Sequence, residues 1–167
     1  PVETSTHAVR GTVNHSLYLA VDALGERPWL TLTMVDVFAW DIDFFSQTRK
    51  GDRFRVVFSK RAFEGEHIGY GDILAAEYWL SEEDRRFRAF RYAHEDGKVG
   101  YYRADGVAVQ KAFLKSPIKF ASITSRYGMR RHPVLKYARA HRGVDYGAPR
   151  GTAIWSVGDG VVSFVGR

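Results

Sequence analysis

The chain has 167 residues, of which 45% are hydrophobic, and it contains no cysteine. This length suffices for one or two domains with a buried core, and no apolar run is long enough to cross a bilayer as a helix. The missing cysteines exclude a disulfide framework and a cysteine-ligated zinc site. The composition therefore indicates a soluble globular chain.

The formal net charge of +6 at pH 7 favours an anionic partner, such as nucleic acid, a membrane surface or an acidic polymer. Lysines and arginines are scattered along the chain and no recognised nucleic-acid motif is present, so we expect no nucleic-acid partner. The densest basic run lies between Arg130 and Arg142. It suits either a solvated face or contact with the carboxylates of a peptide.

The chain begins with Pro1, and no targeting segment precedes the first predicted element. We expect this start to be a processed or engineered boundary, which leaves room for a signal peptide or a membrane anchor upstream. The lack of cysteine does not fix the compartment.

The first quarter of the chain predicts one strand and two helices. The strand is expected over Ala8 to Val13, and Asn14 or Ser16 can cap a helix that ends at Ala23. A second helix is expected over Pro28 to Trp40, because proline suits the first turn of a helix.

The second predicted helix carries Leu32, Val35 and Ala39 at helical spacing, and we expect this face to be buried. The apolar stripe is widened by Leu30, Met34, Val37 and Phe38. Asp41 and Asp43 follow within the motif WDIDFF. Two carboxylates can perform acid–base chemistry, but no histidine lies near them in the sequence. We therefore favour a role in ending and capping the helix.

From Asp52 the hydrophobic period changes to two, which predicts an antiparallel sheet of hairpins. Its strands are the segments RFRVVFSK, HIGYGDILAAEYWL and RRFRAFRYAH, followed by one more strand at GYY. Arginines and aromatic residues alternate in the third segment, as in some nucleic-acid platforms. A simpler interpretation places Phe87 and Ala89 toward the core and the arginines toward water.

A turn at Asp105-Gly106 and a short amphipathic segment over Lys111 to Lys115 lead to Pro117. We place a domain boundary there, with an α+β module of two helices and an antiparallel sheet over residues 1–117. Residues 118–167 then form the beginning of an antiparallel β domain.

The second domain is expected to contain strands over Ala121 to Arg126 and Gly143 to Tyr146, separated by an irregular arm over Tyr127 to Ala140. Two further strands, Thr152 to Val157 and Val161 to Val165, are predicted to pair across a Gly-Asp-Gly turn. Function should concentrate in the arm.

The motif HRGVD is the candidate metal site. His141 and Asp145 supply imidazole and carboxylate, a donor pair that suits zinc when the backbone brings both onto one ion. Gly143, between them, permits a sharp bend. The spacing alone is equally compatible with a surface hydrogen bond.

The surrounding sequence makes the metal interpretation stronger. The run SRYGMRRHP, then HRGVDYGAPRGT, then AIWSV and GDG, resembles the first half of a LytM/lysostaphin-type zinc endopeptidase domain. The resemblance covers about Phe120 to the end of the chain. Farther upstream, WDIDFF, GDRF, ILAAE, GYY and KAFLKSP resemble, in this order, the region that precedes the catalytic domain of MepM-like murein endopeptidases of Gram-negative bacteria.

This resemblance implies a zinc-dependent hydrolase that cuts peptide cross-links of peptidoglycan in the periplasm or cell envelope. His141 and Asp145 would be two of three protein zinc ligands, and the third, with the catalytic residues, belongs to an H-x-H element expected downstream of Arg167. Four residues are expected to contact the stem peptides: Arg130, Arg131, His132 and Arg142. His132 can alternatively serve as a ligand.

The resemblance has further consequences for this chain, and one alternative to it. The chain alone is expected to be inactive, and its open sheet edge could pair with a missing C-terminal piece of the same protein. The module over residues 1–117 would regulate the enzyme or position its substrate. The alternative is a degenerate, zinc-free LytM-type domain that activates an amidase or binds the cell wall, but retention of both ligand residues argues against it.

Overall fold

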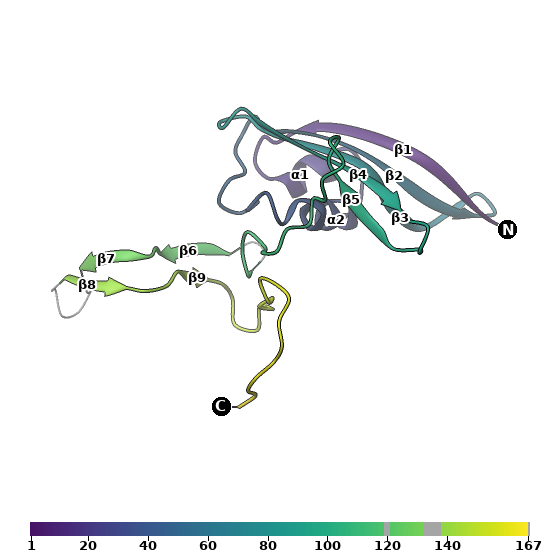
Figure 1. Ribbon diagram of the computed structural model, residues 1–167. Coiled ribbons are helices and arrows are strands. Elements are labelled where there is room, and N and C mark those ends of the chain that lie inside the picture. Colours follow the sequence, from purple (N-terminus) through teal and green to yellow (C-terminus); the bar gives the residue numbers. More distant parts are fainter. Residues whose placement is uncertain (119–120, 132–137, 167) are drawn as a thin grey trace.

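The computed structural model describes residues 1–118, 121–131 and 138–166. A five-stranded sheet carries two helices on one face, and two short two-stranded sheets follow it (Figure 1). The short sheets and the chain end lie on the same side of the large sheet as the helices (Figure 1). This arrangement is an α+β fold, as the sequence predicted.

The large sheet is antiparallel throughout, in the order β1-β2-β3-β4-β5. Its strands are β1 (Val2–Thr12), β2 (Arg53–Phe63), β3 (Glu66–Leu80), β4 (Arg85–Ala93) and β5 (Val99–Tyr102). On β2, Phe54 and Val56 are buried while Arg53 and Arg55 are exposed. The period of two from Asp52 onward is therefore confirmed, and β1 begins six residues earlier than expected.

The two helices are α1 (Leu17–Asp22) and α2 (Pro28–Phe38). Ser16 is the N-cap of α1, and its hydroxyl oxygen accepts a hydrogen bond from the Leu19 amide at 3.2 Å. Pro28 occupies the first turn of α2. Both predicted helices are confirmed.

The buried face of α2 is the one expected, except at Leu32. Leu30, Met34 and Phe38 are fully buried, whereas Leu32 is 50% exposed. Most positions of this helix are apolar, so the spacing of hydrophobic residues does not single out one face. Packing on the sheet selects the face instead.

The core lies between the inner face of the sheet and the helices. Its largest fully buried side chains are Tyr78, Phe38, Phe54, Phe58, Leu30, Met34, Ile42, Ile73, Leu80, Val13, Val21 and Val56. They come from both helices and from β2 and β3, so the helices and the sheet stabilise each other.

A buried carboxylate connects three strand ends. Asp52 is 0% exposed. Its Oδ1 accepts hydrogen bonds from the amide and hydroxyl of Ser81 at 2.8 and 2.9 Å. Its Oδ2 accepts from the Arg49 amide at 2.9 Å and the Tyr78 hydroxyl at 3.2 Å. Its backbone carbonyl accepts from the Val13 amide at 2.8 Å, so Asp52 links the ends of β1, β2 and β3.

The segment that leaves the sheet is irregular and contacts the end of α2. The Lys115 amide donates to the carbonyl of Ala39 at 3.2 Å, and the Leu114 amide donates to the carbonyl of Val157 at 2.6 Å. Residues near 114 therefore lie between the helix and the C-terminal part of the chain. The domain boundary after Pro117 stays a prediction.

The C-terminal part contains four short strands. β6 (Ser122–Ser125) pairs with β9 (Asp145–Gly147), and β7 (Gly128–Arg131) pairs with β8 (Ala138–His141). The expectation of an irregular arm over Tyr127 to Ala140 is thus wrong at both of its ends, which pair as antiparallel strands. Backbone hydrogen bonds form this ladder, and neither GMRR nor ARAH has the β-branched or aromatic residues that mark a strand in a sequence.

The two strands expected after Thr152 are also absent from the described residues up to Gly166. Val161 is 95% exposed and Phe164 is 80% exposed. Trp155 and Val157 each share one backbone hydrogen bond with the exit segment, through Pro117 and Leu114, but these two bonds do not extend into a strand ladder. The apolar residues of Val161 to Val165 therefore do not pack against another layer of the described structure.

Replacing Asp52 should destabilise the fold. In Asp52→Ala the four donors lose a charged acceptor inside the protein, and we expect a loss of about 3 to 4 kcal/mol in the free energy of unfolding. Urea unfolding followed by tryptophan fluorescence measures it. Asp105→Ala, at a side chain that is 60% exposed, is the matched control. A loss below about 1 kcal/mol for Asp52→Ala would contradict the role assigned to this carboxylate.

Tyr78 should make stability depend on alkaline pH. Burial raises the pKa of its hydroxyl, and the adjacent Asp52 carboxylate raises that pKa further. The unfolded chain, with a tyrosine pKa of about 10, then ionises more readily than the folded one. The stability contribution is complete below that pH and is lost as pH rises above it.

Tyr78→Phe should therefore show a shallower fall in the free energy of unfolding above about pH 10 than the unsubstituted chain. Denaturant unfolding at several alkaline pH values measures the slope. Tyr18→Phe, at a residue that is 48% exposed, serves as the control. An identical slope in Tyr78→Phe would count against this assignment.

Candidate functional site

The two predicted zinc ligands face each other across a tight connection between strands. His141 ends β8 and Asp145 begins β9, so only three residues separate them. The distance from His141 Nε2 to Asp145 Oδ1 is 3.2 Å. The His141 side chain is 15% exposed and that of Asp145 is 51% exposed, so the pair is accessible from one side.

Ser125, at the end of β6, and Arg126, which follows it, orient the imidazole of His141. His141 Nδ1 lies 2.9 Å from the backbone carbonyl oxygen of Arg126 and 3.3 Å from the Ser125 hydroxyl. A carbonyl oxygen only accepts, so Nδ1 carries the hydrogen and donates it. Nε2 is then the nitrogen directed at Asp145, and a neutral ring presents its lone pair there. Such a carbonyl contact is the usual support of a metal-binding histidine.

The positions of the two donors fit a zinc ion. A zinc ion about 2.1 Å from each donor in tetrahedral geometry separates the donors by about 3.4 Å. The observed 3.2 Å is close to this value. Without a cation or a proton between them, the imidazole lone pair and the carboxylate would repel each other. The donors therefore suit a metal, or an imidazolium that donates to the carboxylate.

The described residues supply fewer donors than a zinc site uses. The part of the chain that the structure describes contains no group of three or more His, Cys, Asp or Glu side chains that could hold a metal. Zinc sites normally use three or four protein ligands. His141 and Asp145 therefore stay a predicted pair of zinc ligands that needs at least one further donor.

Gly143 does not act as the sequence suggested. Its φ is not among the positive values of the chain, and a Cβ atom built on it would meet no atom within 4 Å. The bend between the two ligands therefore requires no glycine in this structure, because the register of β8 and β9 already brings them together.

The predicted substrate-binding residues are distributed around the pair. Arg142 is exposed and lies directly between the two ligands in sequence. Arg130 and Arg131 are on β7, where Arg131 is opposite Ala138 in the ladder. His132 lies outside the described residues, so its predicted roles stay predictions.

The sequence interpretation missed the role of Ser125 and Arg126. Their signal was present, since both belong to the SRYG run that carried the family resemblance. Only the pairing of β6 with β9 shows that they lie beside His141. Sequence distance concealed a contact between residues 15 and 16 positions apart.

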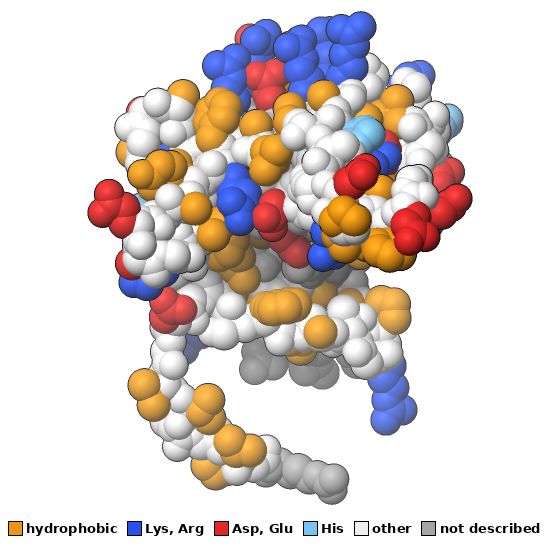
Figure 2. Space-filling view, turned by 90° about the vertical axis from the view of Figure 1, so that its right-hand side faces the viewer, with side chains coloured by type: hydrophobic (Ala, Val, Ile, Leu, Met, Phe, Trp, Pro, Cys, Tyr) orange, Lys and Arg blue, Asp and Glu red, His pale blue; other side chains and the backbone are white. Residues whose placement is uncertain are grey.

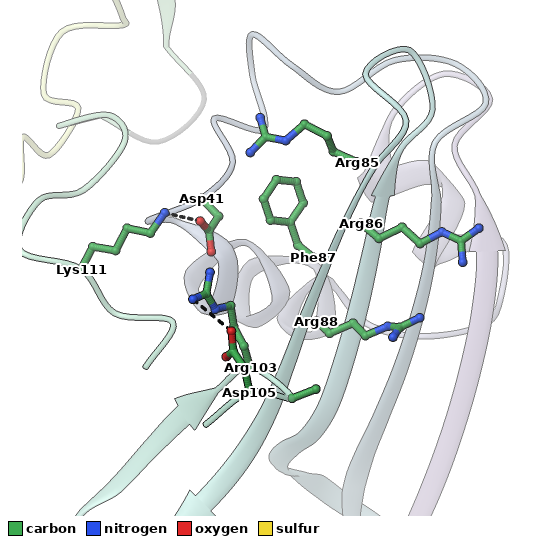
Figure 3. A pocket seen from close by; sticks show the side chains of 9 residues that line it. Asp41, Arg85, Arg86, Phe87, Arg88, Arg103, Asp105 and Lys111 are labelled. Carbon is green, nitrogen blue, oxygen red and sulfur yellow. Dashed lines mark hydrogen bonds and ion pairs between the residues drawn. The ribbon is translucent and has the colours of Figure 1, made fainter. Parts of the chain in front are cut away.

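A cleft of about 610 Å³ lies beside β4, on the side of the segment that leaves the sheet (Figure 3). Its two carboxylates are already paired: Asp41 with Lys111, and Asp105 with Arg103 at 3.4 Å. None of the described residues that line it is a histidine. The cleft therefore carries no acid–base pair of the kind first considered for the WDIDFF motif.

Asp43 caps the turn that follows α2, whereas the helix itself ends at Phe38 with Ala39 as its C-cap. Its Oδ1 accepts hydrogen bonds from the amides of Phe45 and Ser46, and its Oδ2 accepts from the Ser46 hydroxyl at 2.7 Å. Asp41 instead connects the end of α2 to Lys111 on the exit segment (Figure 3). Both carboxylates have structural partners.

No helix among the described residues is long and apolar enough to span a membrane. Comparison with known proteins supports the resemblance read from the sequence. The chain is 42% identical over 132 residues to peptidoglycan DD-endopeptidase ShyC of Vibrio cholerae, covering 78% of the chain and 29% of that protein. It is 37% identical over 131 residues to DD-carboxypeptidase/endopeptidase Mpg of Neisseria meningitidis, covering 71% and 28%.

Among solved structures, a zinc-containing peptidase from Vibrio cholerae matches with a TM-score of 0.53 and 28% identity, over 95% of this chain and 48% of that one. The chain thus spans less than a third of the length of the two curated relatives. The resemblance to murein endopeptidases is confirmed. Residues 3–129 match the family described as the Csd3 second domain, and because this match covers most of the 167 residues, the chain belongs to that family.

Proposed function

We propose that this chain is part of a zinc-dependent peptidoglycan endopeptidase that hydrolyses peptide cross-links of the cell wall. The observation that carries the proposal is the His141–Asp145 pair, with Nε2 and Oδ1 3.2 Å apart and Nδ1 held by the Arg126 carbonyl. The relatives named as peptidoglycan endopeptidases and the zinc-containing peptidase support it. The site of action would be the periplasm or cell envelope of a Gram-negative bacterium.

Each described residue then has a defined task. His141 and Asp145 hold zinc, and the Arg126 carbonyl with the Ser125 hydroxyl keeps the imidazole in the tautomer that exposes Nε2. When bound, zinc supplies an activated water at neutral pH and polarises the scissile carbonyl. Arg142, exposed beside both ligands, is placed to bind a carboxylate of the stem peptide. Arg130 and Arg131 are proposed to extend this contact along β7.

The remaining ligand is proposed to come from an H-x-H element beyond the described residues. Two donors alone hold zinc weakly, so such an element, in the same chain or in a retained C-terminal piece, would complete the centre. Residues 118–167 would then form the N-terminal part of a LytM-type metallopeptidase domain. The module over residues 1–117 would position the substrate or regulate access to the groove.

The alternative of a zinc-free amidase activator or wall-binding module is less favoured. Such a domain would need neither donor, yet here both are present and aligned at a separation that suits one ion. The oriented Nδ1 contact would also serve no purpose in it. Metal content separates the two hypotheses.

The first prediction from this proposal concerns zinc affinity. The 167-residue chain should bind zinc weakly, and His141→Ala or Asp145→Ala should weaken it further by at least about tenfold, because each removes one of two donors. Calorimetric titration with zinc measures the affinity. His94→Ala is the control, since this exposed histidine contacts Tyr102 far from the site. Equal affinity in Asp145→Ala and the unsubstituted chain would remove Asp145 from the site.

The second prediction concerns activity. A longer version of the protein that includes the H-x-H element should release soluble peptides from purified peptidoglycan and contain about one zinc per chain. Asp145→Ala in that protein should reduce the rate by more than about a hundredfold while the chain remains folded. Asp105→Ala should leave the rate unchanged. Full activity in Asp145→Ala, or equal cleavage by the 167-residue chain, would contradict the assignment.

A further inference from the structure

The outer face of the large sheet, opposite the helices, carries two rows of side chains that run across the strands. In one row Arg10, Arg55, Glu77 and Arg88 are successive cross-strand partners on β1 to β4. In the other row Arg53, Trp79 and Arg86 are partners on β2 to β4. We call the set Arg10, Arg53, Arg55, Arg86 and Arg88 the arginine face.

The pictures agree with this placement. Figure 3 shows Arg86 and Arg88 on the opposite side of β4 from Phe87, which points toward Asp41 and the exit segment. Figure 2 shows Lys and Arg side chains gathered at the top of the molecule, around acidic side chains. All five arginines are exposed.

Positive charge on this face is poorly compensated. Arg88 takes the carboxylate of Glu77, with Nε and Oε2 2.6 Å apart. The other four arginines have no ion pair with a carboxylate of the described residues. Like charges directly opposite each other, such as Arg10 and Arg55, destabilise a sheet. The face therefore keeps a charge arrangement that costs stability and favours an anionic ligand.

Two of the arginines are held in place by an aromatic ring. The guanidinium carbon of Arg53 lies 4.1 Å from the centre of the Trp79 ring, and that of Arg86 lies 5.1 Å from it. Stacking orders a guanidinium group without using its N–H donors. These donors remain available for an oxyanion, and guanidinium geometry suits phosphate oxygens.

An apolar hollow lies within the same face. It has a volume of about 160 Å³ and an apolar lining of Val57, Ala75, Ala76 and Phe90, with Arg55, Arg88 and the Glu77 that pairs with Arg88 around it. Phe90 is 43% exposed. A hollow with an apolar floor and a guanidinium rim accommodates a ligand that has hydrocarbon beside an anionic group.

We propose that the arginine face docks on the surface of an anionic phospholipid bilayer, with the arginines binding the phosphate groups of the lipids. The arginines span four strands, about 14 Å across, so they reach several phosphates at once. A single extended peptide would need a groove that follows its path, and the hollow is too small for that. Aromatic residues such as Phe90 and Trp79 are also favoured at the boundary of a bilayer.

Docking would set the orientation of the molecule. The strands β6 to β9, which carry His141 and Asp145, lie on the helix side of the sheet (Figure 1). A bilayer on the arginine face would therefore leave the proposed zinc site directed away from the membrane. The docking proposal rests on the sheet alone and does not depend on the proposed enzymatic activity.

The test is sedimentation of the 167-residue chain with phosphatidylcholine vesicles that contain or lack phosphatidylglycerol. Binding should require phosphatidylglycerol and weaken with salt. In the triple variant R53Q/R55Q/R86Q the partition coefficient should fall by about a hundredfold, because each arginine contributes a factor of about five. The control R27Q/K50Q/K98Q removes the same charge outside the arginine face and should lose less than about tenfold.

Thermal unfolding identifies any variant that does not fold, and the single variant R55Q, expected to lose about fivefold, then provides the measurement. Equal losses in both triple variants would show that net charge alone drives binding and would overturn the proposal. So would equal binding to vesicles without phosphatidylglycerol. Failure to bind vesicles while inorganic phosphate, DNA or purified peptidoglycan binds through the same arginines would also overturn it.

Discussion

The buried carboxylate of Asp52 is the constraint on which the fold depends. A carboxylate removed from water is costly unless donors surround it, and here four hydrogen bonds converge on its two oxygens. These donors come from Arg49, just before β2, and from Tyr78 and Ser81 at the end of β3. Asp52 thus fixes the start of β2 relative to the end of β3, and its backbone carbonyl joins both to Val13 after β1.

Much of this fold could be predicted from the sequence because its signals are local. Alternation on β2 and the cap at Ser16 each involve neighbouring residues, and both were recognised. The GDRF motif carries part of the family resemblance, but the sequence does not show what Asp52 does in it. Asp52 in that motif acts through Ser81, 29 positions away, and no local pattern reports such a contact. Leu32 was misplaced for a related reason, since the sheet decides which side of an apolar helix is buried.

For the candidate site, too, the sequence predicted some features and not others. The donor types and the spacing of His141 and Asp145 were visible in the sequence, and the structure brings them within 3.2 Å. What the sequence could not provide was the support of the imidazole, because the Arg126 carbonyl lies in the connection between β6 and β7, 15 positions from His141. Without the contact between His141 and Arg126, the sequence alone suggested that Gly143 creates the bend. The pairing of β8 and β9 with the preceding strands brings the donors together instead.

The two faces of the large sheet have different physical tasks, and this difference explains the arrangement of the whole chain. The inner face is occupied by the core and by the helices, and the end of α2 connects to the exit segment. The strands that carry the proposed zinc ligands follow on that side (Figure 1). The outer face carries little of the packing and can retain arginines that oppose one another at a cost in stability. A destabilising arrangement of charges is typical of a surface that binds a ligand. One sheet therefore separates the proposed zinc site on one side from the proposed lipid-binding arginines on the other.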